Sequence, residues 1–144
     1  MIKVNIVNTG PYPAPAYQTP GSAGMDLYAC INEPLELAPL ERQLIPTGIH
    51  IALPSGLEAQ VRPRSGLALK KGLTCLNSPG TIDSDYRGMI GVILVNLSNS
   101  PQSIAPGERI AQLVIAHYEH IEWEPVNELP NTTRNAGGFG STGQ

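Results

Sequence analysis

Fifteen glycines and fourteen prolines are spread along the 144 residues of the chain without a fixed period. Both residue types interrupt regular structure, because glycine is conformationally permissive and proline lacks a backbone N–H group. Hydrophobic residues still make up 41% of the chain, which excludes a collagen-like or disordered polymer. We therefore expect many short strands joined by turns, in one domain at this length.

Hydrophobic and polar residues alternate over residues 49–53 and 57–62. A period of two predicts strands with one buried face, here joined by a turn at residues 54–56. Residues 89–97 and 110–118 are more continuously apolar and are bounded by turn residues, which is typical of strands in the interior of a sandwich or barrel. The sequence therefore predicts an all-β barrel or jelly roll.

One short helix is predicted from Gly66 to Lys71, with Ser65 as its N-cap and Gly72 as its C-terminal stop. Arg64 precedes it, so a guanidinium and a hydroxyl stand beside the N–H groups of the first helical turn, a setting that favours an anion. From these residues alone, a phosphate site and a plain helix cap explain the segment equally well.

The net charge of −3 argues against general binding to nucleic acid, which needs a broad basic face. Any anion site must therefore be local. Cys30 and Cys75 lack the spacing of a metal or redox motif and are expected to be buried and reduced. No signal segment follows Met1 and no apolar run is long enough to span a bilayer, so we expect a cytoplasmic protein.

Polar side chains crowd a turn-rich loop with the sequence Asn77-Ser-Pro-Gly-Thr-Ile-Asp-Ser-Asp-Tyr-Arg-Gly88. Loops of this kind often bind a ligand, although Asn and Asp are also common turn residues. A carboxylate here could act as a general base towards water, and Asn77 could read a donor and an acceptor on a nucleobase. Covalent hydrolysis is disfavoured because the chain has no G-x-S-x-G motif.

The chain ends in Arg134-Asn-Ala-Gly-Gly-Phe-Gly-Ser-Thr-Gly-Gln144, which combines glycines with hydrogen-bond donors and one aromatic side chain. The donors could bind phosphate and Phe139 could stack on a base, but a glycine-rich terminus is also typical of a frayed end. A polar linker from about Glu124 to Thr133 leads into this tail. Trp123 is expected to pack on the domain as an anchor.

Five segments resemble, in the right order, the five motifs of the trimeric dUTPase family. They are Ala23-Gly-Met-Asp-Leu-Tyr-Ala29, Pro63-Arg-Ser-Gly-Leu-Ala68, Gly80-Thr-Ile-Asp-Ser-Asp-Tyr-Arg-Gly88, Gly107-Glu-Arg-Ile-Ala-Gln112, and the tail from Arg134 to Gly143. Each motif alone is weakly specific, but the ordered set covers almost the full length of the chain.

The resemblance implies a distorted jelly-roll homotrimer with one short helix, in which each active site takes residues from all three chains. It assigns residues 1–133 to a dUTPase-like β domain and residues 134–144 to a flexible lid. The implied reaction is hydrolysis of dUTP to dUMP and pyrophosphate with Mg²⁺ as cofactor, which limits uracil incorporation into DNA and supplies dUMP for thymidylate synthesis. No direct contact with nucleic acid or membrane is implied.

The same resemblance assigns roles to single residues. Asp83 would deprotonate the water that attacks the α-phosphorus, and Gln112 would position that water or hold the phosphate. Asp26 would belong to the network around the metal-bound waters, with Mg²⁺ held by the triphosphate and waters rather than directly by the protein. Asn77 would read uracil and Tyr86 would pack under the deoxyribose. The other implied substrate-binding residues are Arg64, Ser65 and Gly66 on phosphate oxygens, Arg134, Ser141 and Thr142 at the γ end, Phe139 stacked on uracil, and Gly80, Thr81, Ile82, Met89 and Gly140.

Two alternatives remain beside this reading. A dCTP deaminase of the same fold is disfavoured by residues 82–86 and by the glycine tail with Phe139. A non-catalytic nucleotide sensor or protein-binding module on the same scaffold is disfavoured by the presence of Asp83, Gln112 and the tail, although a second, regulatory role is compatible with all three.

Overall fold

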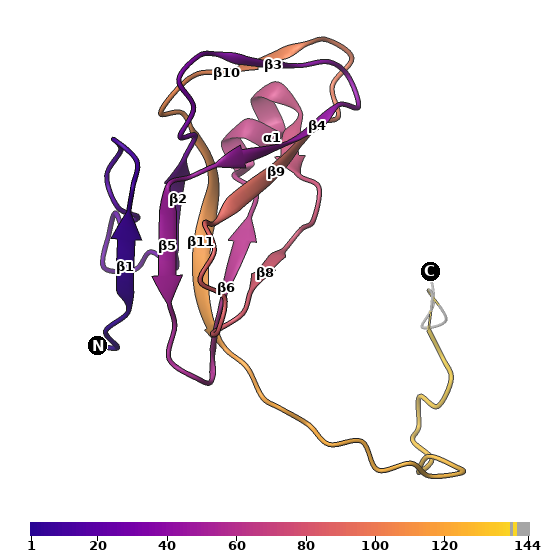
Figure 1. Cartoon of the computed structure of the whole chain (residues 1–144). Coiled ribbons are helices and arrows are strands. Elements are labelled where there is room, and N and C mark those ends of the chain that lie inside the picture. The colour runs from indigo at the N-terminus through magenta and orange to yellow at the C-terminus, as the bar shows by residue number, and fades with distance from the viewer. Residues whose placement is uncertain (139, 141–144) are drawn as a thin grey trace.

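A computed structural model describes residues 1–138 and 140. Within them, short strands follow one another along the chain and are interrupted by a single helix (Figure 1). The elements are β1 (Asn5–Asn8), β2 (Gly24–Tyr28), β3 (Leu35–Leu37), β4 (Arg42–Pro46), β5 (Ile49–Ala52), β6 (Leu57–Arg62), α1 (Ser65–Lys71), β7 (Leu73–Cys75), β8 (Gly80–Ile82), β9 (Gly91–Asn96), β10 (Gln102–Ile104) and β11 (Arg109–His117).

The strands pair into four small antiparallel sheets. The largest has the order β2-β11-β6-β8, a second has the order β4-β9-β7, and two pairs are formed by β1 with β5 and by β10 with β3. The β10–β3 pair crosses the top of the molecule, above α1 (Figure 1). The predicted all-β architecture with one short helix is confirmed.

Alternation in the sequence corresponds to burial in the structure. Along β6, Leu57, Ala59 and Val61 are buried while the residues between them are not. β9 lies within the predicted interior segment 89–97, and β11 begins one residue before the predicted segment 110–118 and ends inside it. Both strands contribute buried residues to the same hydrophobic core. β6 thus buries one face and leaves its polar side chains on the other face of the largest sheet.

The predicted helix is confirmed, but its N-cap is Arg64 rather than Ser65. Arg64 is extended, with φ −99° and ψ 128°, and its carbonyl accepts the first helical hydrogen bond from the N–H group of Ala68 at 3.1 Å. Ser65 therefore already belongs to the helix, so its hydroxyl lies beyond the capping position. Gly72 ends the helix in the left-handed conformation, with φ 65°, as predicted.

Both cysteines carry free thiols; Cys75 is buried, whereas Cys30 is only half-buried. The predicted burial is therefore confirmed for Cys75 but not for Cys30. The described part of the chain contains no helix with the length and apolar character needed to cross a membrane.

Beyond β11 the chain leaves the domain as an extended segment (Figure 1). The prediction that Trp123 packs on the domain is wrong, because 83% of the residue is exposed. Ile121 and Leu129 on the same segment are 68% and 82% exposed. The apolar side chains of this segment are thus not covered by the domain of their own chain.

Candidate active site

Three polar residues form a row across the outer face of the largest sheet. Gln112 on β11 lies directly opposite Asp26 on β2 and opposite Arg62 on β6. The neighbours of Gln112 in the strand, Ala111 and Leu113, are buried. Because side chains alternate between the two faces of a strand, Gln112 points away from the core together with its cross-strand partners.

Asp26 is held between two arginines. Nε of Arg64 lies 2.9 Å from Oδ1 of Asp26, and Nη1 of Arg109 lies 3.2 Å from Oδ2. Nη1 of Arg64 also donates to the carbonyl oxygen of Arg109 at 3.1 Å. Two bonds therefore fix the plane of the Arg64 guanidinium, and one carboxylate brings both cations to the edge of the sheet.

Gln112 is fixed by contacts to two other predicted motifs. Its Nε2 donates to the carbonyl oxygen of Pro63 at 3.0 Å. Gly24 lies directly beneath it, so that a Cβ atom added at Gly24 would collide with Oε1 of Gln112. The glycine of the first motif therefore leaves room for the amide of the fourth motif, and that amide in turn holds the segment that precedes α1.

Ser65 and Gly66, the first residues of α1, are exposed directly after Arg64. With Arg64 and Gln112 they present guanidinium, amide, hydroxyl and backbone donors from one short stretch of surface. We call Arg64, Ser65, Arg109 and Gln112, together with the Asp26 carboxylate that accepts from both arginines, the donor cluster. Donors of these kinds are the groups that bind phosphate oxygens in proteins.

A second set of predicted site residues lies around β8. Gly80, Thr81 and Ile82 form this strand, which pairs with β6. A Cβ atom on Gly80 would lie only 3.0 Å from Nδ2 of Asn77, so the amide is packed against this glycine. The structure therefore brings Asn77 together with β8, as the sequence-based assignment requires.

Residues 83–89, which follow β8, form an exposed loop that we call the Tyr86 loop. The N–H group of Tyr86 donates to the carbonyl oxygen of Asp83 at 3.2 Å, and the hydroxyl of Tyr86 donates to the carbonyl oxygen of Met89 at 3.1 Å. Asp83, Tyr86 and Met89 are thus grouped on one turn, with Tyr86 44% and Met89 39% exposed.

Within one chain, the donor cluster and the Tyr86 loop are far apart. β2 and β8 are the opposite edges of the sheet, three strand spacings apart, or about 14 Å. Ile82 lies level with Ala59 and Ile115, so Asp83 is also displaced along the strands from the row of Gln112. Asp83 and Gln112 of one chain therefore do not meet at a common reacting atom.

The tail begins with a turn at Arg134. Nε of Arg134 donates to the carbonyl oxygen of Gly137 at 2.8 Å, which closes a small turn away from the domain (Figure 1). Gly140 has a φ of 87° and is exposed. The predicted contacts of Phe139, Ser141 and Thr142 lie outside the described residues.

Sequence reasoning missed two members of this site. Arg109 lies within the fourth motif, but its pairing with Asp26 depends on the register between β11 and β2. Gly24 lies in the first motif, but its role depends on the position of the Gln112 side chain. Only the cross-strand neighbours, which the sequence does not specify, reveal both functions.

The structure is that of an all-β protein with guanidinium, amide and hydroxyl groups gathered at one edge of its largest sheet. Residues 11–143 match the family model described as dUTPase. The chain belongs to the dUTPase family, as the sequence motifs predict.

Curated relatives match the chain over nearly its whole length. The deoxyuridine 5'-triphosphate nucleotidohydrolase of Cytophaga hutchinsonii is 60% identical over 141 residues, covering 98% of this chain and 92% of the relative. The protein of the same name from Finegoldia magna is 54% identical, with 99% of both chains covered. The solved dUTPase of Staphylococcus bacteriophage 80alpha with dUPNHPP has a TM-score of 0.89 and 25% identity, with 100% of both chains covered.

Proposed function

We propose that this chain hydrolyses dUTP to dUMP and pyrophosphate by attack of water on the α-phosphorus. Family membership supports the activity. The structural observation that supports it is the donor cluster, whose groups suit the binding of phosphate oxygens. A nucleoside triphosphate bears about four negative charges, which a locally concentrated set of donors can balance on a protein of negative net charge. Phosphoryl transfer depends mainly on positioning and charge stabilisation, so little covalent chemistry is needed from the protein.

Asp83 is the proposed general base. Its carboxylate accepts a proton from the water whose oxygen forms the new bond to the α-phosphorus, while the bond from that phosphorus to the α,β-bridging oxygen breaks. The bridging oxygen leaves with pyrophosphate. Gln112 holds the water or the phosphate, since its amide can donate and accept hydrogen bonds. Asp83 is exposed on the Tyr86 loop, where solvent water can reach it.

The phosphate oxygens are bound by Arg64, Ser65 and Gly66, with the arginine already oriented by Asp26. Arg134, Ser141 and Thr142 of the tail complete the site by binding the γ-phosphate. Gly140 permits a backbone φ of 87°, which other residues rarely adopt. In this proposal residues 1–133 form the β domain and residues 134–144 form its lid.

Uracil is read by Asn77 together with the backbone of Gly80, Thr81 and Ile82, and Phe139 stacks on its face. Tyr86, with Met89 beside it, packs under the deoxyribose and leaves no room for a 2′-hydroxyl. The support for this part is the grouping of these residues around β8 and the Tyr86 loop.

Mg²⁺ fits this site as a cofactor carried by the substrate. Both carboxylate oxygens of Asp26 are engaged by arginines, at 2.9 and 3.2 Å, so this carboxylate is not presented as a direct metal ligand. Hard oxygen ligands from phosphates and waters suit the ion instead. When bound with dUTP, Mg²⁺ would supply additional neutralisation of phosphate charge, and Asp26 would act through hydrogen bonds from the waters of the ion rather than as a direct ligand.

The proposed roles of Asp83 and Gln112 require a homo-oligomer, because the two residues lie on different parts of the sheet in one chain. A homotrimer with three shared sites meets this requirement with a closed symmetry axis. The apolar residues Ile121, Trp123 and Leu129, exposed on the segment after β11, support contact with another copy of the chain. With this activity the enzyme would limit uracil in DNA and supply dUMP in the cytoplasm.

Release of pyrophosphate from dUTP, measured with and without Mg²⁺, tests the proposal. In ¹⁸O-labelled water, we expect the label in dUMP and not in pyrophosphate, because water attacks the α-phosphorus. Asp83→Asn should bind dUTP normally and lose at least about 10²-fold in kcat, the usual contribution of a general base. Release of ammonia from dCTP without pyrophosphate would instead identify a deaminase, and nucleotide binding without turnover would identify a sensor.

A further inference from the structure

The Tyr86 loop is exposed, and its shape depends on a small number of hydrogen bonds. Only one backbone bond, from the N–H group of Tyr86 to the carbonyl oxygen of Asp83, closes the turn at 3.2 Å. Residues 83, 85, 86 and 87 are all exposed, so packing against the core does little to hold them. Side chains that crosslink this loop therefore determine where the ring of Tyr86 lies.

Arg87 supplies such a crosslink. Its Nη1 donates to the carbonyl oxygen of Ser84 at 2.7 Å and to the carbonyl oxygen of Tyr86 at 2.9 Å. One charged group thus ties the two sides of the turn together, and hydrogen bonds from a charged donor are stronger than those between neutral groups. Both acceptors are backbone atoms of the same loop, so no sequence motif marks this role of Arg87.

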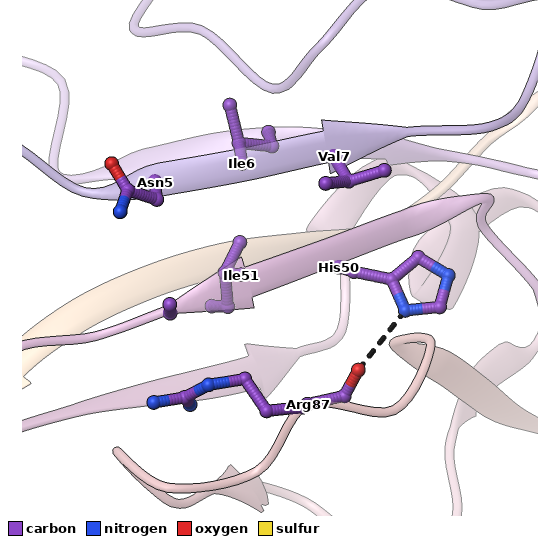
Figure 2. Close-up of a pocket in the computed structure, with 7 residues that line it drawn as sticks. Asn5, Ile6, Val7, His50, Ile51 and Arg87 are labelled. Atoms are coloured by element: carbon purple, nitrogen blue, oxygen red, sulfur yellow. Dashed lines mark hydrogen bonds between the residues drawn. The ribbon is translucent and has the colours of Figure 1, made fainter.

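His50 anchors the same residue to the body of the protein. A ring nitrogen of His50, on β5, lies 3.2 Å from the carbonyl oxygen of Arg87 (Figure 2). Three residues further along, the N–H group of Ile90 donates to the carbonyl oxygen of Ile49 at 2.8 Å. The C-terminal side of the loop is therefore attached to β5 at two points, and His50 provides the one nearer to Tyr86.

The ring of Tyr86 folds back over Gly88. A Cβ atom added at Gly88 would collide with the ring and hydroxyl of Tyr86, while the hydroxyl itself donates to Met89. The ring therefore cannot move closer to Gly88. It can change position only if the backbone at residues 84–87 moves. That backbone is the part that Arg87 crosslinks.

We propose that Arg87 and His50 are positioning residues that determine selectivity against ribonucleotides by fixing Tyr86. This inference rests on the proposed function, in which Tyr86 excludes the 2′-hydroxyl. Steric exclusion requires a ring that cannot retreat by the size of a hydroxyl group. Arg87 prevents that retreat from within the loop, and His50 prevents it from β5.

The test compares kcat/KM for dUTP and for UTP in the full-length enzyme. Arg87→Ala is expected to reduce the dUTP/UTP ratio by at least about tenfold, the loss of roughly 1.4 kcal/mol of discrimination. His50→Phe keeps a ring on β5 but removes the nitrogen, and should reduce the ratio in the same direction. Arg42→Ala is the matched control, because Arg42 is an exposed arginine on β4, in a different sheet from β8.

A double-mutant cycle separates positioning from general loosening. In a Tyr86→Ala background, Arg87→Ala should leave the dUTP/UTP ratio within about twofold, because the ring through which it acts is absent. The proposal would be overturned if Arg87→Ala lowered the dUTP/UTP ratio of the Tyr86→Ala variant by as much as it lowers the ratio of the wild-type protein. A ratio for the single Arg87→Ala variant within twofold of the wild-type ratio would also overturn it.

The two proposals fail separately in this experiment. If the wild-type protein releases no pyrophosphate from dUTP, the proposed function itself is wrong. If the wild-type protein prefers dUTP and both Arg87→Ala and His50→Phe keep that preference, only the positioning role is wrong. Thermal unfolding of each variant, expected to match the Arg42→Ala control, establishes that selectivity is compared between folded proteins.

Discussion

Nε of Arg64 lies 2.9 Å from Oδ1 of Asp26, and this ion pair joins the segment before α1 to the edge strand β2. The side chains are 28% and 15% exposed, so water weakens the attraction between them. Pairs of this kind contribute only about 0–1 kcal/mol to stability. The pair is better explained as a device that orients the guanidinium towards a ligand.

Asp26→Asn should therefore reduce activity much more than stability. We expect kcat/KM for dUTP to fall by about tenfold or more, since the plane of the Arg64 guanidinium is no longer fixed. Steady-state kinetics and thermal unfolding measure the two effects. Glu36→Gln, at an exposed carboxylate on β3, is the control. A large drop in melting temperature with unchanged kcat/KM would show that the pair is structural.

Gly24→Ala tests the packing beneath Gln112. The new Cβ atom would collide with Oε1 of Gln112 and push the amide away from the carbonyl oxygen of Pro63. We expect kcat/KM to fall by about tenfold or more because the amide is misplaced, with only a small loss of stability, since the group that must move is the end of the flexible Gln112 side chain. Gly21→Ala is the matched control, because a Cβ atom there would meet nothing within 4 Å. Equal activity of the two variants would contradict this role of Gly24.

Burial raises the pKa of the Cys75 thiol to about 11 from its ordinary value of 9.0. The folded state therefore favours the neutral thiol, and the unfolded state ionises first as the pH rises. Stability from this group is complete below pH 9 and is lost between pH 9 and about 11. Denaturant unfolding of wild-type protein and Cys75→Ala at several pH values measures it. The stability difference between the two should shrink with rising pH; a constant difference would refute the linkage.

Deletion of residues 137–144 tests the proposed lid. Among the described residues, the hydrophobic core includes none beyond β11, so the melting temperature and the oligomeric state should be unchanged. We expect kcat/KM for dUTP to fall by more than about tenfold, because the tail donors and the stacking ring act only on bound nucleotide. Removal of Gln144 alone serves as the control. Full activity of the variant that lacks residues 137–144 would show that the tail is a frayed end and not a lid.

Local structure was largely predictable because short-range pattern determines it. The alternation over β6 predicted its buried face, and Gly72 predicted the end of α1. Strand pairing was not predictable in this way. β5 and β6 are consecutive and joined by a short turn, yet they pair with different partners in different sheets. Their separation depends on tertiary contacts that no local pattern contains.

The candidate site shows the same limit. The sequence motifs pointed to Asp26 and Arg64 separately, but the link between them arises because β11 brings their segments together. The role proposed for Arg87 could not be predicted from a residue pattern, because its acceptors are carbonyl oxygens of its own loop. Trp123 was assigned to the wrong environment because the sequence does not say whether an apolar residue packs within its own chain or on another copy.

A mixing experiment tests the central claim, that one active site combines the donor cluster of one chain with the Tyr86 loop of another. Arg64→Ala and Asp83→Asn are each prepared as pure, inactive proteins, then unfolded, mixed in equal amounts and refolded. With random assembly, about one quarter of the sites contain both native residues, so we predict recovery of about one quarter of wild-type dUTP hydrolysis. No recovery in refolded mixed oligomers, when wild-type protein regains activity under the same conditions, would contradict a site shared between chains.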